Sequence, residues 1–239
     1  MSEIWIRPPY ASGGGSALKI DNARVYGLGD SIVASGLPKV AEHDKDKFEH
    51  DSDLIWEDAS ASHTRRAVKL ASCTGGESHD CFLCGIVVQA NITAPRYWWP
   101  EFQRYHFADI VSSTSTMHKL KAFVEKAVAL QDEGKMNEYC KLASAHFSPY
   151  THPAVINGFM TLAGGLVKLD KMDIEMLKAS LPEGWLQTAR ITTNYRQLKT
   201  MYRQRRNHRL QEWRDFCAWM ETLPMASELI LGKEDKGNE

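Results

Sequence analysis

The chain has 239 residues, of which 43% are hydrophobic and 25% are charged, with 16 glycines and 9 prolines. This composition excludes disordered, collagen-like and low-complexity proteins, and the length suffices for one large domain or two small ones. Because 29 lysines and arginines face 30 aspartates and glutamates, the net charge of −1 excludes an overall electrostatic attraction to nucleic acid or anionic lipid.

The charge is nevertheless segregated along the chain. Residues 42–58 carry eight acidic residues and two lysines, a net charge of −6, which is typical of a solvated loop. Residues 190–214 carry eight lysines and arginines and one glutamate, a net charge of +7. We expect no signal peptide, because the first residues lack an apolar run of the required length, and no later run is long enough to span a bilayer. The five cysteines are few and odd in number. We therefore expect a reduced protein of the cytoplasm without a membrane partner.

The predicted elements give a helix-dominated α+β fold. Residues 1–60 are expected to form an irregular N-terminal extension or arm, 61–225 a single domain, and 226–239 a polar C-terminal tail. Apolar spacing and breaker residues predict, in chain order, a short strand at 24–27, a helix over 63–72, a strand over 85–93, an aromatic helical segment over 98–111, a hydroxyl-rich break over 112–116, two helices within 117–145, helices over 154–167 and 172–179, and one or two long helices over 195–223.

Cysteine and histidine come together at residues 79–84, which read His-Asp-Cys-Phe-Leu-Cys. A Cys-x-x-Cys pair beside a histidine is typical of the start of a zinc site. A closed zinc site needs a fourth ligand, and Cys73 is the one further thiol nearby in the sequence. The alternative, which we favour, is a pair of buried and inert cysteines, so no metal site is predicted.

Two further segments contain residue types that commonly bind a phosphate or stack on a planar ring. Residues 96–106 combine arginine, histidine and a row of aromatic side chains, which can hold a phosphate and stack on a ring. The alternative is a helix whose aromatic side chains belong to the core. Residues 194–209 contain most of the lysines and arginines of the basic segment 190–214. This composition fits a clamp for a small polyanion, a nucleic-acid-binding face or a solvated helix. Neither a Walker loop nor a Rossmann loop is present.

Both segments resemble the flavin-dependent thymidylate synthases of the ThyX type. In that family a Gly-His pair precedes a strand that ends in Ala-Pro, and a following helix carries an Arg-His-Arg triplet. The residues at the same spacing here are Ser78-His79, the strand 86–93, Ala94-Pro95 and Arg104-Tyr105-His106. The C-terminal half of the family carries Leu-Pro, then Thr-x-Asn-x-Arg-x-Leu and a later arginine. The matching residues are Leu181-Pro182, residues 192–198 and Arg205.

The resemblance implies a mixed α/β subunit with a small central sheet packed by long helices, assembled as a homotetramer with FAD bound between subunits. It implies that NADPH reduces the flavin and that methylene-tetrahydrofolate supplies a one-carbon unit to a pyrimidine nucleotide. The implied cofactor-binding residues are His79, Arg104, His106, Asn194 and Arg196. The implied substrate-binding residues are Glu101, Arg104, Ser112, Ser113, Ser115 and Arg205. Arg205 is also the implied catalytic residue, because an arginine beside the base stabilises negative charge on a uracil oxygen.

The sequence departs from the family in the nucleotide-binding half. The middle histidine and the last arginine of the triplet are Tyr105 and His106, and Asp109 replaces a serine. A family stretch with a glutamate and an arginine is replaced by residues 111–117, which are rich in hydroxyl groups. Because this change removes a bidentate phosphate partner, the expected substrate is dUMP or a related nucleotide. The alternative is a non-catalytic protein of this fold that binds nucleic acid or a partner protein through its basic helices, although the neutral total charge disfavours nucleic acid.

Overall fold

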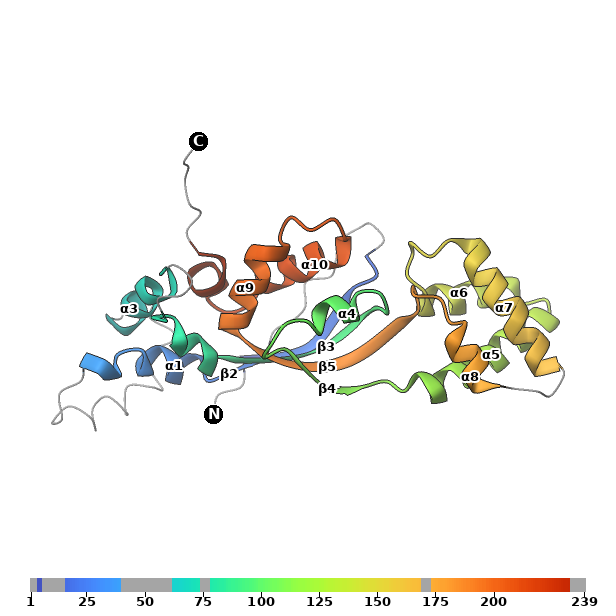
Figure 1. The fold of residues 1–239 in the computed structure, drawn as a ribbon, viewed down its shortest axis with the longest axis horizontal. Coiled ribbons are helices and arrows are strands. Elements are labelled where there is room, and N and C mark those ends of the chain that lie inside the picture. The colour runs from blue at the N-terminus through green and yellow to red at the C-terminus, as the bar shows by residue number, and fades with distance from the viewer. Residues whose placement is uncertain (1–3, 6–15, 40–61, 74–77, 169–172, 233–239) are drawn as a thin grey trace.

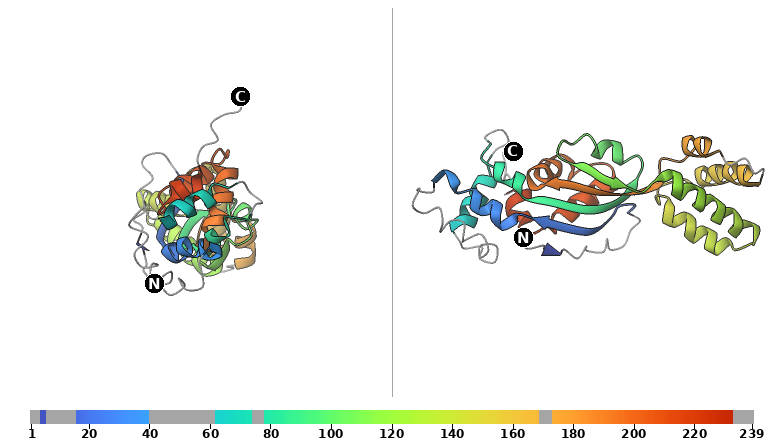
Figure 2. Two further views of the ribbon diagram at one scale, coloured as in Figure 1. Left: turned by 90° about the vertical axis from the view of Figure 1, so that its left-hand side faces the viewer. Right: turned by 90° about the horizontal axis from the view of Figure 1, so that it is seen from below.

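The computed structural model describes residues 4–5, 16–39, 62–73, 78–168 and 173–232. The molecule is elongated (Figure 1), with an antiparallel sheet in the middle, helices packed against the sheet, and a further group of helices at one end. The right-hand view of Figure 2 shows this group projecting beyond the ends of the strands. We refer to the helices α5 to α8, with the segments that connect them and the residues up to Trp185, as the helical lobe. The rest of the described chain is the sheet body.

The sheet is antiparallel and has the strand order β1-β2-β3-β5-β4. Its strands are β1 (Ile4–Trp5), β2 (Lys19–Tyr26), β3 (Val87–Pro95), β4 (Asp109–Ser113) and β5 (Leu186–Asn194). Buried and half-buried residues alternate along β3 and β5, so one face of the sheet packs on the core. The other face is polar: the guanidinium of Arg190 on β5 donates to Asn91 Oδ1 at 3.3 Å and to Gln89 Oε1 at 3.2 Å.

Helices cover the apolar face of the sheet and one of its ends (Figure 1). They are α1 (Leu28–Ala34), α3 (Ser62–Ala71), α4 (Trp99–Phe102), α9 (Tyr195–Arg205) and α10 (Gln211–Met220), with the 3-10 helices η1 (Leu37–Lys39) and η4 (Cys81–Gly85) and the π-helical turn η5 (Ser227–Leu231). The fully buried rings of Trp98, Phe102, Trp213 and Phe216 pack together at centroid distances of 4.9 to 6.1 Å. The aromatic residues of segment 96–106 that form this cluster therefore belong to the core.

The turn between β2 and α1 brings the N-terminal part of the chain against η4. Gly27 has a φ of 68°, in the left-handed region that favours glycine. A Cβ atom at this position would lie 2.7 Å from the carbonyl oxygen of Gly85 at the end of η4. Only a residue without a side chain lets the backbone at Gly27 come this close to the carbonyl of Gly85, and this contact positions η4 beside the sheet.

The helical lobe has a hydrophobic core of its own. It comprises α5 (Thr116–Asp132), α6 (Met136–His146), α7 (Pro153–Lys168) and α8 (Ile174–Ala179). The three-four spacing of apolar residues in α5 buries one face of that helix, including Leu120, Phe123 and Val124. Trp185, just before β5, packs against Phe123 at a centroid distance of 5.0 Å. Arg96, just after β3, links the two parts, because its Nη1 donates to the carbonyl of Leu181 at 3.2 Å.

The structure confirms the helix-dominated α+β fold and most of the predicted elements. The helix at 63–72 is α3, the strand at 85–93 is β3, and segment 117–145 contains α5 and α6. The segment 195–223 forms two helices, α9 and α10. These elements have strong apolar periodicity, which is why the sequence predicts them.

Four predicted segments differ from the structure. The supposedly irregular residues 1–60 contain β2 and α1, both part of the sheet body, whereas the acidic run at 42–58 lies outside the described residues. The segment 98–111 forms the short α4 and then β4, and the hydroxyl residues Ser112 and Ser113 belong to that strand and not to a break. In the predicted polar tail, residues 227–231 form η5, which buries Leu229 and Ile230. Strand pairing and tertiary burial override the local composition in each case.

Candidate functional site

The candidate site begins where β5 passes directly into α9. Asn194 is the last residue of β5 and the N-cap of α9, and its Oδ1 accepts a hydrogen bond from the backbone N–H of Gln197 at 2.9 Å. Asparagine is among the preferred N-cap residues because it satisfies one of the free N–H groups of the first turn. The N–H of Tyr195 donates to the carbonyl of Ile86 at 3.0 Å, which fixes the start of α9 beside the end of η4.

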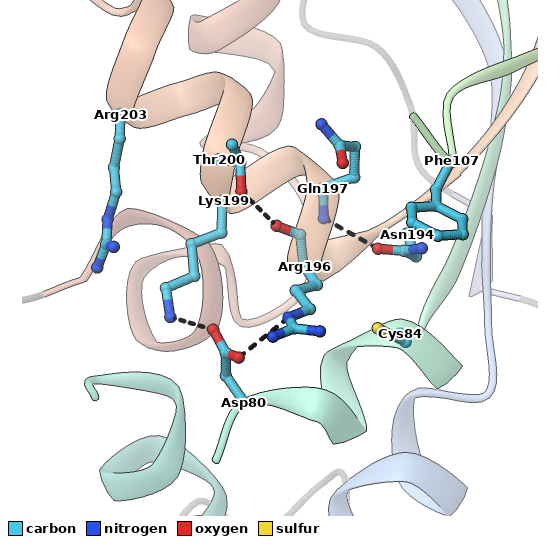
Figure 3. A pocket seen from close by; sticks show the side chains of 9 residues that line it. All are labelled: Asp80, Cys84, Phe107, Asn194, Arg196, Gln197, Lys199, Thr200 and Arg203. Atoms are coloured by element: carbon cyan, nitrogen blue, oxygen red, sulfur yellow. Dashed lines mark hydrogen bonds and ion pairs between the residues drawn. The ribbon is translucent and has the colours of Figure 1, made fainter. Parts of the chain in front are cut away.

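A cavity of about 550 Å³ opens between this end of α9, η4 and the chain before β4 (Figure 3). Its lining residues are Asp80, Cys84, Phe107, Asn194, Arg196, Gln197, Lys199, Thr200 and Arg203. Arg196, Thr200 and Arg203 are four and three residues apart, so they form one stripe along α9. Leu198 and Met201 lie on the buried side of the same helix and anchor it to the core.

Asp80 connects the wall of the cavity to a buried cation of α9. Its Oδ2 accepts from Nζ of Lys199 at 2.7 Å, and its Oδ1 lies 3.1 Å from Nε of Arg196. Burial alone opposes the charged form of Asp80, but the hydrogen bond from Lys199 and the charges of Lys199 and Arg196 outweigh it, so the pKa of Asp80 lies below its ordinary value. The side chain of Lys199 is 4% exposed and also donates to the carbonyl of Ala71 at 2.7 Å. This network ties α3 and the start of η4 to α9.

The cavity has an excess of positive charge. Three cationic side chains, Arg196, Lys199 and Arg203, stand against the one carboxylate of Asp80, which leaves a net charge of +2. Partial burial disfavours the charged form of Arg196, but the neighbouring Cys84 side chain and the charge of Asp80 raise its pKa. Arg203 is exposed and forms no ion pair within the described ranges. Together with the partial positive charge at the start of α9, these groups suit an anionic ligand such as a diphosphate.

Arg205 lies in a second cluster on the opposite face of α9. At 100° per residue it is about 180° around the helix from Arg196. Its Nη1 donates to Glu101 Oε2 at 3.0 Å and its Nε donates to the hydroxyl of Tyr105 at 2.8 Å. The indole N–H of Trp213 donates to the same Glu101 oxygen at 2.9 Å, and the guanidinium carbon of Arg205 lies 4.7 Å from the Trp213 ring centre. The charge of Arg205 is therefore compensated by Glu101 within the chain.

The remaining predicted site residues lie on the surface and do not join either cluster. His79 is exposed next to Asp80, and Arg104 and His106 are exposed between α4 and β4. Ser112 and Ser113 are exposed on β4, which is an edge strand of the sheet. Ser115 is the N-cap of α5, where its Oγ accepts from the N–H of His118 at 3.4 Å. Of the residues predicted from the sequence, the structure thus brings together Asn194 with Arg196, and Glu101 with Arg205.

The basic segment 190–214 does not form a single clamp for a polyanion, which was one of the three alternatives that its composition left open. Arg190 lies on the polar face of the sheet, Lys199 pairs with Asp80, and Arg205 pairs with Glu101. Arg214 donates to the carbonyl of His208 at 2.6 Å. The sequence missed these intramolecular partners because Asp80 and Glu101 are more than 100 residues from the cations that they bind.

The cysteines also differ from the expectation. Cys81 and Cys84 are exposed, not buried, and no disulfide joins them. Within the described ranges, no group of three or more histidine, cysteine or acidic side chains is placed to hold a metal ion. No helix in the part of the chain that the structure covers combines the length and apolar character needed to cross a membrane.

Comparison with known proteins bears on the fold. Models of known protein families give no match to the sequence, and curated proteins give none either. Among solved structures, the chain is similar to thymidylate synthase X (ThyX) from Helicobacter pylori with FAD and dUMP: the TM-score is 0.61 and the identity is 15%, over 90% of this chain and 96% of that one. A second structure of the flavin-dependent enzyme ThyX from the same organism, complexed with FAD and dUMP, has a TM-score of 0.57 and 14% identity, over 90% and 98% of the two chains. The predicted ThyX-like mixed α/β fold is thereby confirmed.

Proposed function

We propose that this protein is a flavin-dependent enzyme that transfers a one-carbon unit from methylene-tetrahydrofolate to a pyrimidine nucleotide, dUMP or a related one, with NADPH as the reductant. The observation that carries the proposal is the cation-lined cavity at the start of α9 in a fold shared with ThyX. Fold alone does not determine activity, so the charge and shape of this cavity carry the functional argument. We place the enzyme in the cytoplasm.

The cavity fits the diphosphate of FAD. Its volume of about 550 Å³ lies in the range of cofactor sites, and its net charge of +2 matches a diphosphate. Arg196 and Arg203 would bind the phosphate oxygens, while Asn194 holds the start of α9 and His79 borders the site from outside. Bound FAD would supply the redox chemistry, and the role of these side chains is to orient it.

Arg205 is the residue that we propose to act on the nucleotide base. Glu101 and Tyr105 hold its guanidinium with two hydrogen bonds, and Trp213 packs against its face. A guanidinium fixed in this way needs no reorganisation to stabilise negative charge that develops on a pyrimidine oxygen. In this role Glu101 would orient Arg205.

Assembly of several subunits would bring the separate groups of residues together, and we propose a homotetramer. Four of the five residues of the edge strand β4 are exposed, and the segment around it carries the exposed apolar side chains Phe107, Val111 and Met117, which are 72%, 57% and 50% exposed. Exposed apolar residues concentrated in one segment are typical of a surface that another protein covers. Contact with a neighbouring subunit at β4 would bring Ser112 and Ser113, and the nearby Arg104 and His106, against that subunit.

The proposed reaction is tested by incubating the protein with FAD, NADPH, methylene-tetrahydrofolate and dUMP and analysing the nucleotide by mass spectrometry. We expect a product that is heavier than dUMP by one added carbon unit, formed only when all four components are present. Arg205→Lys keeps the charge but loses the paired hydrogen bonds, so its product formation should fall by at least about tenfold. Arg206→Lys, at an exposed neighbouring position, is the matched control. An unchanged nucleotide would contradict one-carbon transfer to dUMP.

A second candidate function is binding of nucleic acid without catalysis. It is favoured by three exposed arginines near the end of α9, namely Arg203, Arg206 and Arg209. Binding of this kind would weaken steeply with salt concentration, because each phosphate contact releases counterions. Salt-dependent binding of single-stranded DNA in the absence of FAD binding would favour this candidate over the enzyme.

A further inference from the structure

The short helix η4 carries two exposed thiols, and one of them, Cys84, lines the cavity. Cys81 opens η4 and Cys84 lies three residues later, and both side chains are exposed. Leu83, between them, is fully buried in the core and anchors the helix. The two cysteines therefore lie on the solvent side of a short helix that the buried Leu83 anchors to the core.

The helical geometry of η4 suits a disulfide between these two residues. In a 3-10 helix the side chains of residues i and i+3 are eclipsed, and a rise of about 2.0 Å per residue separates their Cα atoms by roughly 6 Å. Disulfides in proteins have Cα separations of about 4.4 to 6.8 Å. Cys81 and Cys84 therefore need little backbone movement to form a bond.

A cation lies beside one of the two sulfur atoms. Cys84 and Arg196 both line the cavity and lie next to each other there (Figure 3). A guanidinium in this position attracts the negative charge that a sulfur atom carries during thiol–disulfide exchange. Geometry and charge thus both favour reaction at Cys84.

The other three cysteines differ from this pair. Cys217 is buried, and burial together with the charge of Glu221 raises the pKa of its thiol to about 12. The half-buried Cys73 has its thiol directed at the carbonyl of Lys69, 3.7 Å away. Cys140 is exposed on α6 in the helical lobe, where no second cysteine of that helix accompanies it. Cys140 provides the matched control for an exposed but isolated thiol.

We propose that Cys81 and Cys84 form a redox-active dithiol site that reacts with small disulfides such as oxidised glutathione. One thiolate attacks the small disulfide, which forms a mixed disulfide and releases one small thiol. The second protein thiol then attacks the mixed disulfide, forms the Cys81–Cys84 bond and releases the second small thiol with its proton. The pair loses two electrons and two protons, and the small disulfide gains them. Oxidation also bonds the sulfur of Cys84, which lines the cavity with Arg196, to Cys81, so the state of the pair alters the wall of the cavity.

The test equilibrates the purified full chain with mixtures of reduced and oxidised glutathione, traps free thiols with N-ethylmaleimide, and measures intact and peptide masses. We expect the two thiols to disappear together, giving a species lighter by two hydrogens whose bond maps to Cys81 and Cys84. Separate glutathione adducts on Cys81 and Cys84 without an internal bond would overturn the proposal. A disulfide to Cys73 or between two chains would overturn it as well. None of these readouts depends on FAD binding, so the result is independent of the proposed enzymatic function.

Single variants sharpen the assignment. Cys81→Ser and Cys84→Ser should each trap the remaining cysteine as a stable glutathione adduct, whereas Cys140→Ser should form the internal disulfide as the unaltered protein does. Arg196→Met should slow the first exchange step about fivefold, which corresponds to the loss of one charge about 4 Å away in water. Arg206→Met is the control for a general change of charge. An unchanged rate in Arg196→Met would overturn the role of this arginine at the dithiol site.

Discussion

On one face of α9, Arg196 and Arg203 line an open cavity with an excess of positive charge, whereas on the opposite face Arg205 is held by Glu101, Tyr105 and Trp213. Both faces draw their arginines from the same basic segment of the sequence. The difference lies in the partners: the first face keeps charge available for a ligand, and the second uses a carboxylate of the chain itself to fix a guanidinium. A basic segment is thus not one site, and each cation has to be assigned by its contacts.

The largest expected effect concerns the buried pair beneath the cavity. Asp80→Asn should lower the free energy of unfolding by roughly 3–5 kcal/mol, because the charge of the nearly buried Lys199 would lose its partner. Urea denaturation followed by tryptophan fluorescence measures this change. Asp109→Asn, at an exposed position of β4, is the matched control and should change stability by no more than about 0.5 kcal/mol.

The same pair predicts a dependence of stability on pH. Because the pKa of Asp80 is lowered in the folded protein, its contribution is fully present above the unfolded-state value of about 4 and is lost as the pH falls through the lower folded-state value. Unfolding measured from pH 6 down to pH 3 should show a loss of stability that Asp80→Asn reduces. An acid dependence identical in both proteins would contradict the ion pair.

An intermediate effect is expected on the opposite face of α9. Glu101→Ala should lower the free energy of unfolding by roughly 1–3 kcal/mol, because it leaves Arg205 and the indole N–H of Trp213 without their acceptor. Glu101→Gln keeps an acceptor for Trp213 and should have a smaller effect. The surface pair of Lys121 and Glu125 is the control, and Glu125→Ala should change stability by about 0.5 kcal/mol or less. If Glu101→Ala and Glu125→Ala lowered the free energy of unfolding equally, the ion pair between Glu101 and Arg205 would not hold Arg205 in place.

The smallest change in free energy is expected at the open face. Arg203→Met should weaken FAD binding by about tenfold, the effect of one charge-assisted hydrogen bond to a phosphate, while the stability of the free protein stays unchanged. Arg206→Met removes an equally exposed arginine outside the cavity lining and should leave FAD affinity unchanged. Fluorescence titration with FAD measures both. Equal losses in the two variants would indicate a general charge effect and not a site.

The sequence was informative where the pattern is local. The apolar spacing of residues 117–130 predicts α5, and the β-branched run at 85–93 predicts β3, because each pattern reports one buried face. The strands β4 and β5 were not predicted, and only the end of β2 was, as the short strand at 24–27. Most residues of β4 are exposed, and β2 pairs with a partner about 70 residues away. Strand pairing of this kind depends on contacts that no window of the sequence contains.

For the site, residue types were predicted better than partners. Asn194 and Arg196 lie at the cavity, as the resemblance to ThyX suggested, and Glu101 meets Arg205. No pattern in the sequence indicates that Asp80 binds Lys199, or that Tyr105, which stands where the family has a histidine, accepts a hydrogen bond from Arg205. Each of these contacts joins segments more than 90 residues apart, so only the folded chain reveals it.

The central claim, that the open face of α9 binds FAD, is tested most directly by titrating the purified protein with FAD and recording the visible absorption spectrum. We predict that the flavin bands shift on saturable binding, that NADPH bleaches them, and that the double variant Arg196→Met/Arg203→Met loses the shift while remaining folded. A spectrum that stays that of free FAD at every protein concentration would contradict the claim.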